Sequence, residues 1–309
     1  MVTPAAGAQF DTFPERFGLG ARALRLRWPA AVAGLAGASI SVIAVAAAHG
    51  LLHIVVEVSV ASLAMALGAL AAMATLNKSY RQFVETMAKA LDARDSYTAG
   101  HSCRVADYCY GTGRALGFSK RAARTLLEAA QLHDIGKIGV SDAVLQKPGP
   151  LTREEIGLIR LHPVIGRKIL ERTGRFKKLL PVVELHHENW DGTGYPYGMR
   201  GEEIPLEARI ARVADAFDAM TSARVYRTAP TVDWAAEELR RCSGTDFDPH
   251  VAGVFLALLQ NGVFNETLAS GAGDSWASGA GSSPWNPEAY TELALEIAAG
   301  TARSFRQRA

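Results

Sequence analysis

Five of the chain's eight histidines stand between positions 101 and 187, several of them beside acids or at expected helix ends. A single histidine is more often a core or surface residue than a ligand. Five of them with carboxylates nearby favour a metal site, because imidazole and carboxylate together suit Fe, Mn or Zn. Such residues could converge on the axis of a helix bundle. The five are His101, His133, His162, His186 and His187.

The segment "HDIGK" (133–137) contains a histidine directly followed by an aspartate. Consecutive residues do not share a helix face, so both side chains reach one site only where a helix ends, and Gly136 permits such an end. Asp134 could then bridge two metal ions while His133 binds one, with Lys137 near a substrate phosphate. Two ions roughly 3.5–4 Å apart are a recurring solution for phosphoester hydrolysis, since they generate hydroxide at neutral pH and neutralise developing charge.

A second segment, "HHENWDGTGYP" (186–196), combines adjacent histidines, two acids, spaced glycines and a Tyr-Pro end. Two interpretations fit these residues. Either metal ligands are followed by a tight loop over a phosphate, or the segment is a polar surface turn. The residues alone leave both interpretations open.

The motifs between positions 91 and 259 resemble the HD-GYP family, a branch of the HD metal-dependent phosphohydrolases that hydrolyses the bacterial messenger cyclic di-GMP. The resemblance implies an all-α fold, an HD-type helical bundle with a dinuclear metal site. It implies a phosphodiesterase of signal transduction that opens cyclic di-GMP to linear pGpG, with either pGpG or GMP as the final product. The motifs, in the family's order, are "DSYTAGHS" (95–102), "HDIGKIGVSD" (133–142), "LQKPGPLT" (145–152), "HPVIG" (162–166), "HHENWDGTGYP" (186–196), "ARIARVADAFDAMTSARVYR" (208–227) and "GTDFDP" (244–249).

The resemblance also implies roles for individual residues. Lys137 and Asp134 would act at the scissile phosphate. Arg224 and Arg227 would contact substrate phosphate through their planar donor forks, although without the family two such arginines are more often a solvated face. Metal ligands would be His133, Asp134, His162, His186, His187 and Asp215, with His101 at an additional site, and substrate would meet the loop residues Asp191, Gly192, Gly194, Tyr195 and Pro196.

Several details refine these expectations. Glycines at 192 and 194 would let the backbone approach a ligand, and Tyr195 could offer a ring face to a base. Glu188 is interpreted either as a hydrogen-bond partner of a ligand histidine or as a surface acid. Family members with three metals are similar in carrying a glutamate where this chain has Tyr97. We therefore expect two divalent ions, Fe or Mn, and no third.

Two rival functions follow from the same motifs. One is a catalytically silent receptor for cyclic di-GMP or a protein-interaction module; the complete ligand set argues against it, because a pure binder does not need metals. The other is an HD phosphohydrolase acting on another nucleotide, which the GYP loop argues against.

Helices must position these residues. Ser119 is the expected N-cap of "KRAARTLLEAAQLH", and Thr152 with Glu155 forms an expected capping box before "IGLIRLH". Further helices are expected at 174–188, 205–221 and 231–242. No segment alternates like a strand, which favours an all-α domain at 78–262. The Gly/Ser-rich composition after it predicts a flexible linker and tail at 263–309.

The hydrophobic content of 49% has its source near the N-terminus, in apolar runs at 28–48 and 51–76. Each run is long enough to cross a bilayer, which predicts a transmembrane hairpin at 28–77 after a tail at 1–27. Arginines and lysines flank both runs, so both termini and the catalytic domain should face the cytoplasm at a bacterial inner membrane. A cleaved signal peptide and a buried hairpin of a soluble protein are the alternatives.

Two remaining features concern partners. Tyr80, Val84, Met87 and Leu91 recur at helical spacing, which predicts either a homodimer seam within 78–92 or a face packed on the chain's own domain. A net charge of +2 without a long basic block gives no indication of DNA or RNA binding. The three cysteines form no paired motif, as is typical of a reducing compartment.

Overall fold

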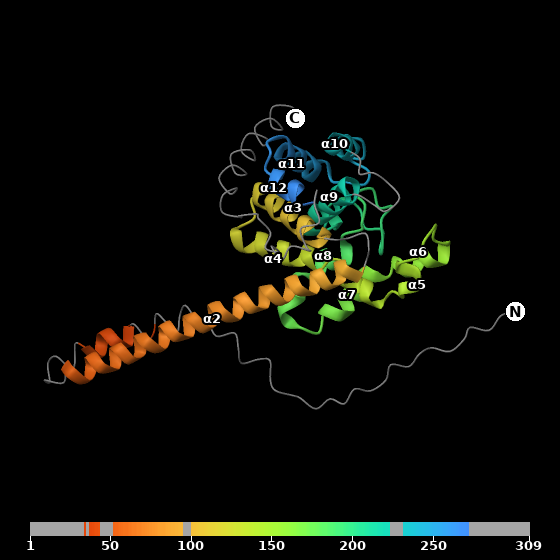
Figure 1. Ribbon diagram of the computed structural model, residues 1–309. Coiled ribbons are helices and arrows are strands. Elements are labelled where there is room, and N and C mark those ends of the chain that lie inside the picture. Colours follow the sequence, from red (N-terminus) through yellow and green to blue (C-terminus); the bar gives the residue numbers. More distant parts are fainter. Residues whose placement is uncertain (1–33, 35–36, 44–51, 95–99, 223–230, 272–309) are drawn as a thin grey trace. The chain divides into compact units, whose positions relative to one another are not determined.

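The computed structural model describes residues 34, 37–43, 52–94, 100–222 and 231–271 (Figure 1). The chain forms two compact units that divide between Asn77 and Lys78. Within the described ranges every regular element is helical, apart from an isolated bridge between Ser243 and Phe247. The predicted all-α fold is confirmed for this part of the chain.

The long helix α2 (Leu52–Arg94) contains the second apolar run. From His53 onward it is long and apolar enough to cross a membrane, and no other helix in the described ranges is. Helices of soluble cores and signal sequences pass the same test, so this helix indicates a membrane span without establishing one. The first run is described only at 34 and 37–43, and residues 49–50 between the two runs lie outside the described residues. The hairpin is thus not confirmed.

The part of α2 from Lys78 onward packs within the second unit. Val84 and Ala88 are buried there, with exposed fractions of 1% and 0%. Tyr80, Met87 and Leu91 are half-buried against the same core. The face that predicted a homodimer seam is therefore covered by the chain's own domain, which was the alternative interpretation.

Most predicted helix ends are confirmed. The Ser119 hydroxyl accepts the amide hydrogen of Ala122, and Thr152 and Glu155 form the expected capping box. The helix expected at 174–188 is instead broken in two, because Pro181 has no amide hydrogen and its ring obstructs a continuous helix. The helices after α2 are α3 (His101–Ala115), α4 (Lys120–Gln131), η1 (Ile135–Gly139), α5 (Asp142–Leu145), α6 (Arg153–Ile159), α7 (His162–Leu170), η2 (Gly174–Lys178), α8 (Leu180–Leu185), η3 (Gly201–Glu203), α9 (Leu206–Thr221), α10 (Val232–Arg241), α11 (Pro249–Gln260) and α12 (Asn265–Gly271).

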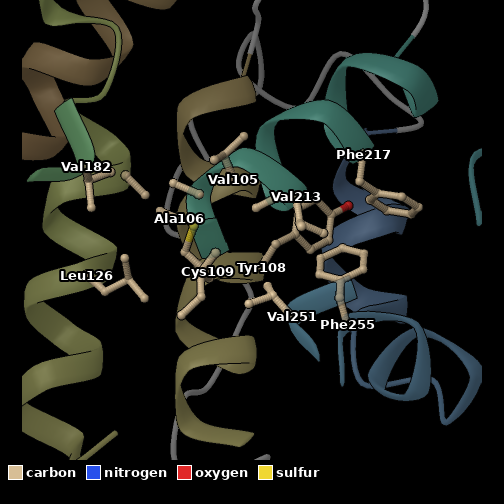
Figure 2. Packing of buried hydrophobic residues seen from close by; sticks show 14 of the residues in the cluster. Val105, Ala106, Tyr108, Cys109, Leu126, Val182, Val213, Phe217, Val251 and Phe255 are labelled. Atoms are coloured by element: carbon tan, nitrogen blue, oxygen red, sulfur yellow. The ribbon is translucent and has the colours of Figure 1, made fainter. Parts of the chain in front are cut away.

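An aromatic cluster fixes the helices that carry candidate ligands. Tyr108 of α3 meets Phe217 of α9 and Phe255 of α11 edge to face, with ring centroids 5.4 and 5.8 Å apart (Figure 2). Such arrangements are favoured between aromatic rings and add to the gain from burial. The cluster therefore orients α3, which begins at His101, against α9, which carries Asp215.

The domain extends further than the sequence indicated. Val263 and Phe264 are fully buried, and α12 continues the fold to Gly271. Phe264 fits because Gly111 on α3 has no side chain; a Cβ there would lie 2.8 Å from the Phe264 ring. The linker prediction is wrong for 263–271, because Val263, Phe264 and Leu268 pack on the domain's core. Residues 272–309 lie outside the described residues.

Candidate metal centre

A close contact between η1 and α7 brings the first ligands together. Helix α4 ends at Gln131, so His133 and Asp134 lie in the turn that leads into η1. A Cβ on Gly136 would lie 1.8 Å from the carbonyl oxygen of His162. Only glycine allows the two backbones to approach so closely. The contact sets the His-Asp pair beside His162, as a helix end at this point predicted.

All seven predicted ligands lie in two adjoining groups of donor atoms, and within each group the atoms are within 4.8 Å of one another. The first group is Asp134, His162, His186 and His187, and the second is His101, His133 and Asp215.

The two aspartates lie between these groups. Asp134 Oδ1 is 3.2 Å from His162 Nε2, while its Oδ2 is 3.4 Å from His133 Nε2. Asp215 Oδ1 is 3.3 Å from His101 Nε2, and its Oδ2 is 4.0 Å from His187 Nδ1. Each carboxylate thus has one oxygen toward each group, which is the arrangement a bridging ligand requires.

The histidine rings are oriented for metal binding. Nδ1 of His133 and of His162 each lies 2.7 Å from a backbone carbonyl oxygen, and Nδ1 of His186 lies 3.1 Å from two. A carbonyl only accepts, so Nδ1 must donate and Nε2 keeps its lone pair. Nε2 of His162 and Nε2 of His186 are 3.3 Å apart. A proton or a metal ion between the two nitrogens would relieve the repulsion of their lone pairs, and because oxygen of Asp134 and nitrogen of His187 converge on the same place, these residues fit a divalent metal.

Two residues that the sequence did not single out support His101. Asp218 is 1% exposed, and its Oδ2 lies 2.8 Å from His101 Nδ1. Arg104 donates from Nε to Asp218 Oδ1 at 2.7 Å and from Nη2 to Oδ2 at 2.9 Å. The spacing offered a signal, because Asp218 follows Asp215 by three residues and Arg104 follows His101 by three, one helical turn each.

Electrostatics keep most of these groups in the protonation states that bind metal. Burial acts to raise the pKa of Asp134, but the charge of Lys137 and the interactions with His133 and His162 outweigh it and hold that pKa well below its usual range. Burial and the neighbouring histidines lower the pKa of His186 far below normal, and burial lowers that of His187 to about 3. At neutral pH the carboxylate is therefore ionised and both imidazoles are neutral.

His101 differs. Burial acts to lower its pKa, but bonds to Asp215 and Asp218 outweigh burial and raise it to about 10. In the absence of metal this imidazole carries a proton at neutral pH. A metal that binds in the second group must displace that proton.

Lys137 and the loop after His187 border the centre. Lys137 Nζ lies 2.7 Å from Asp134 Oδ2. The Tyr195 ring stacks on His187 with centroids 4.7 Å apart, and the Arg160 guanidinium lies 5.1 Å from the Tyr195 ring centroid on that ring's face. Asp191 Oδ1 accepts hydrogen bonds from the Thr193 amide and hydroxyl, which holds the turn. The loop therefore packs against the metal centre, and Pro196 follows Tyr195 within it.

Three loop residues have structural roles that the sequence analysis did not name. Gly194 is needed for the loop's own packing, since a Cβ there would lie 2.2 Å from the Asn189 backbone nitrogen. Gly192 is needed for its φ of +85°, which side chains rarely adopt. The Glu188 carboxylate accepts the amide hydrogens of Tyr197 and Met199 at 2.7 and 3.1 Å, so it holds the loop and not a ligand histidine.

Three residues from the sequence analysis lie outside the described ranges. They are Tyr97, at the position of the glutamate in three-metal relatives, and the two candidate phosphate-binding arginines, Arg224 and Arg227.

Comparison with known proteins identifies the family of this domain. Residues 85–251, more than half of the chain, match the family described as HD domain. The fold and the site define an all-helical domain with His/Asp groups that could hold metal. The chain belongs to the HD-domain family.

Several curated proteins are similar to the domain. The chain is 41% identical over 189 residues to the cyclic di-GMP phosphodiesterase response regulator RpfG of Xanthomonas campestris pv. campestris, covering 60% of this chain and 50% of that protein. It is 42% identical over 175 residues to the 3'3'-cGAMP-specific phosphodiesterase 3 of Vibrio cholerae, covering 56% and 38%. It is 38% identical over 184 residues to a cyclic di-GMP phosphodiesterase of Thermotoga maritima, covering 57% and 49%. The chain thus spans about half or less of these relatives.

Among solved structures, the chain is similar to a cyclic GMP-AMP-specific phosphodiesterase of V. cholerae, V-cGAP3. The TM-score is 0.49 at 20% identity, over 71% of this chain and 58% of that one. This likeness is too weak to bear on function.

Proposed function

We propose that this protein is a metal-dependent phosphodiesterase that hydrolyses cyclic di-GMP to pGpG and onward to GMP, thereby lowering the level of the messenger. The observation that carries the proposal is the convergence of histidine Nε2 atoms on two aspartates that face both groups. The relatives named as cyclic dinucleotide phosphodiesterases support the substrate class.

Two divalent ions, Fe or Mn, are the proposed cofactors. Asp134, His162, His186 and His187 would hold one, and His101, His133 and Asp215 the other. Such ions supply a hydroxide nucleophile at neutral pH and neutralise the charge that develops on the phosphate. His101 is thus assigned to the second of two ions in this proposal, and no third ion is needed.

The chain's own residues would orient the substrate. Lys137, 2.7 Å from Asp134, is suited to contact the scissile phosphate through its ammonium group. Tyr195, whose ring contacts His187 and Arg160, would offer a ring face to a guanine base. Arg224 and Arg227 remain the proposed contacts to the second phosphate. Prior positioning of charge in a water-poor site accounts for most of the expected acceleration.

A second substrate has support of its own. Relatives from V. cholerae named as 3'3'-cGAMP-specific phosphodiesterases are 42% and 35% identical to the chain. This cyclic dinucleotide differs from cyclic di-GMP in one base, so the same phosphate chemistry would serve both. A catalytically silent receptor is the less favoured alternative, because seven intact ligands have no purpose in a pure binder.

We further propose that the protein resides in a bacterial inner membrane with its termini and catalytic domain in the cytoplasm. The apolar segment of α2 supports this. A homodimer through 78–92 would have to use the opposite face of α2, where Phe83 is 57% exposed, since Val84 and Ala88 are buried in the domain.

The test is turnover by the purified 309-residue chain, prepared without oxygen and loaded with Mn or Fe, with cyclic di-GMP and 3'3'-cGAMP compared. The proposal expects linear product from cyclic di-GMP and a loss of turnover of at least about a hundredfold in His162→Ala or Asp134→Ala. Arg241→Ala, at an exposed ion pair with Glu238, is the matched control. Tight binding of either nucleotide without product, under every metal, would identify a receptor instead.

A further inference from the structure

We propose that Arg94, the last residue of α2, is a positioning residue for the segment that carries Asp134 and Lys137. The inference rests on the proposed function and concerns how that site is held. The Arg94 guanidinium donates from Nη1 to the Lys137 carbonyl at 2.9 Å and from Nη2 to the Val140 carbonyl at 2.6 Å. Its Nε donates to Asp142 Oδ1 at 2.8 Å.

These hydrogen bonds join the end of α2 to the end of η1, more than 40 residues later in the sequence. A 3₁₀ helix of five residues has few internal hydrogen bonds and poorer bond geometry than an α-helix. Bonds from a charged guanidinium are about twice as strong as neutral ones, and its planar fork fixes both carbonyl directions at once. Arg94 therefore sets the direction in which η1 ends, and with it the place of Lys137.

The same helical turn also holds the other half of the centre. Asp92 is 7% exposed and accepts the Ser102 amide at 3.2 Å and the Ser102 hydroxyl at 2.6 Å. Ser102 is next to the candidate ligand His101 at the start of α3. In addition, Gln146 donates from Nε2 to the Arg94 carbonyl at 3.1 Å. The last turn of α2 is thus bonded to the segments on both sides of the centre.

Lysine could not replace this arginine. Its ammonium is a single point of donation, whereas Arg94 reaches two carbonyls and a carboxylate from different nitrogens. The Arg94 side chain is 27% exposed, so a small guanidinium ion from solution could enter the space left by its removal.

The experiment compares Arg94→Ala, Arg94→Lys and wild type as Mn-loaded full chains acting on cyclic di-GMP. We expect kcat of Arg94→Ala to fall about tenfold or more while KM changes by less than about twofold, because misplacement of catalytic groups affects chemistry more than binding. Added methylguanidinium should restore part of kcat in Arg94→Ala and none in Arg94→Lys. Arg241→Ala, which removes another arginine with its ion pair, should match wild type.

Amide hydrogen exchange of residues 135–140 provides a second readout that needs no turnover. Exchange should rise in Arg94→Ala and stay unchanged in Arg241→Ala. If the wild type hydrolyses no cyclic dinucleotide but exchange rises in this way, the proposed function fails while the positioning role stands. Unchanged exchange, unchanged kcat, or a loss of kcat that methylguanidinium does not restore in folded protein would overturn the role of Arg94.

Discussion

At the scale of single residues, a substitution of Asp218 tests whether its carboxylate orients the His101 ring. A carboxylate bonded to the outer nitrogen of a ligand histidine fixes the ring, and its loss typically costs about 10–100-fold in metal affinity. We expect Asp218→Asn to lower the affinity for the second metal by this factor while the first group stays filled. Metal titration of the stripped chain measures both steps.

Asp233→Asn, a change at an exposed acid in the first turn of α10, is the control for Asp218→Asn. Equal loss of both metals in Asp218→Asn, or no loss at all, would contradict the assignment of His101 to a separate group.

The raised pKa of His101, about 10, predicts a pH dependence for the second metal. Below that pKa the imidazole is protonated, so each unit of falling pH should weaken this metal about tenfold through competition with the proton. His187, with a pKa of about 3, imposes no such competition on the first group near neutrality. Metal titrations at about pH 6.5 and about pH 8.5 measure how the affinity for each metal changes with pH. The same slope for both metals would contradict the assignment.

At this scale the sequence predicts much of the site. The seven residues that the family resemblance implied as ligands lie together in two groups of donor atoms, with Lys137 2.7 Å from Asp134. The supporting residues are harder to predict. Asp218 and Arg104 each follow a candidate ligand by three residues, but their pairing at His101 depends on the packing of α3 against α9.

At the scale of elements, the substitution Gly136→Ala tests the close contact between η1 and α7. A Cβ at this position would overlap the His162 carbonyl, so Gly136→Ala must push the two elements apart. We expect a loss of roughly 2–4 kcal/mol in the free energy of unfolding, in the range of overpacked or strained sites, together with loss of metal. Chemical denaturation and metal content measure the two effects.

Gly157→Ala in α6 is the matched control, since nothing lies within 4 Å of a Cβ there. It should stabilise the protein by up to about 1 kcal/mol, because alanine favours the helix. A Gly136→Ala variant as stable as wild type would show that the elements do not touch as described.

Helix ends with side-chain caps are predictable, as Ser119 and Thr152 illustrate, because the cap is local. The break before α8 had a local signal in Pro181 that the apolar periodicity obscured. The anchor at Phe264 could not be predicted, since its place in the core depends on the absence of a side chain at Gly111, far away in the sequence.

At the scale of the whole molecule, the apolar segment of α2 predicts association with membranes. The expressed chain should sediment with the membrane fraction and resist extraction by alkaline carbonate. The double variant Leu63→Lys and Leu67→Lys should be released, because each lysine near the centre of a membrane helix costs about 2.5–3.5 kcal/mol. Wild type in the supernatant would contradict a membrane location.

The most direct test of the central claim is the metal dependence of turnover. The 309-residue chain is stripped with a chelator, and loss of cyclic di-GMP is followed as Mn is added back. The account predicts no turnover in the stripped protein and recovery that is complete at two metal ions per chain. Turnover that survives complete removal of metal, or full metal loading without any loss of cyclic di-GMP, would contradict it.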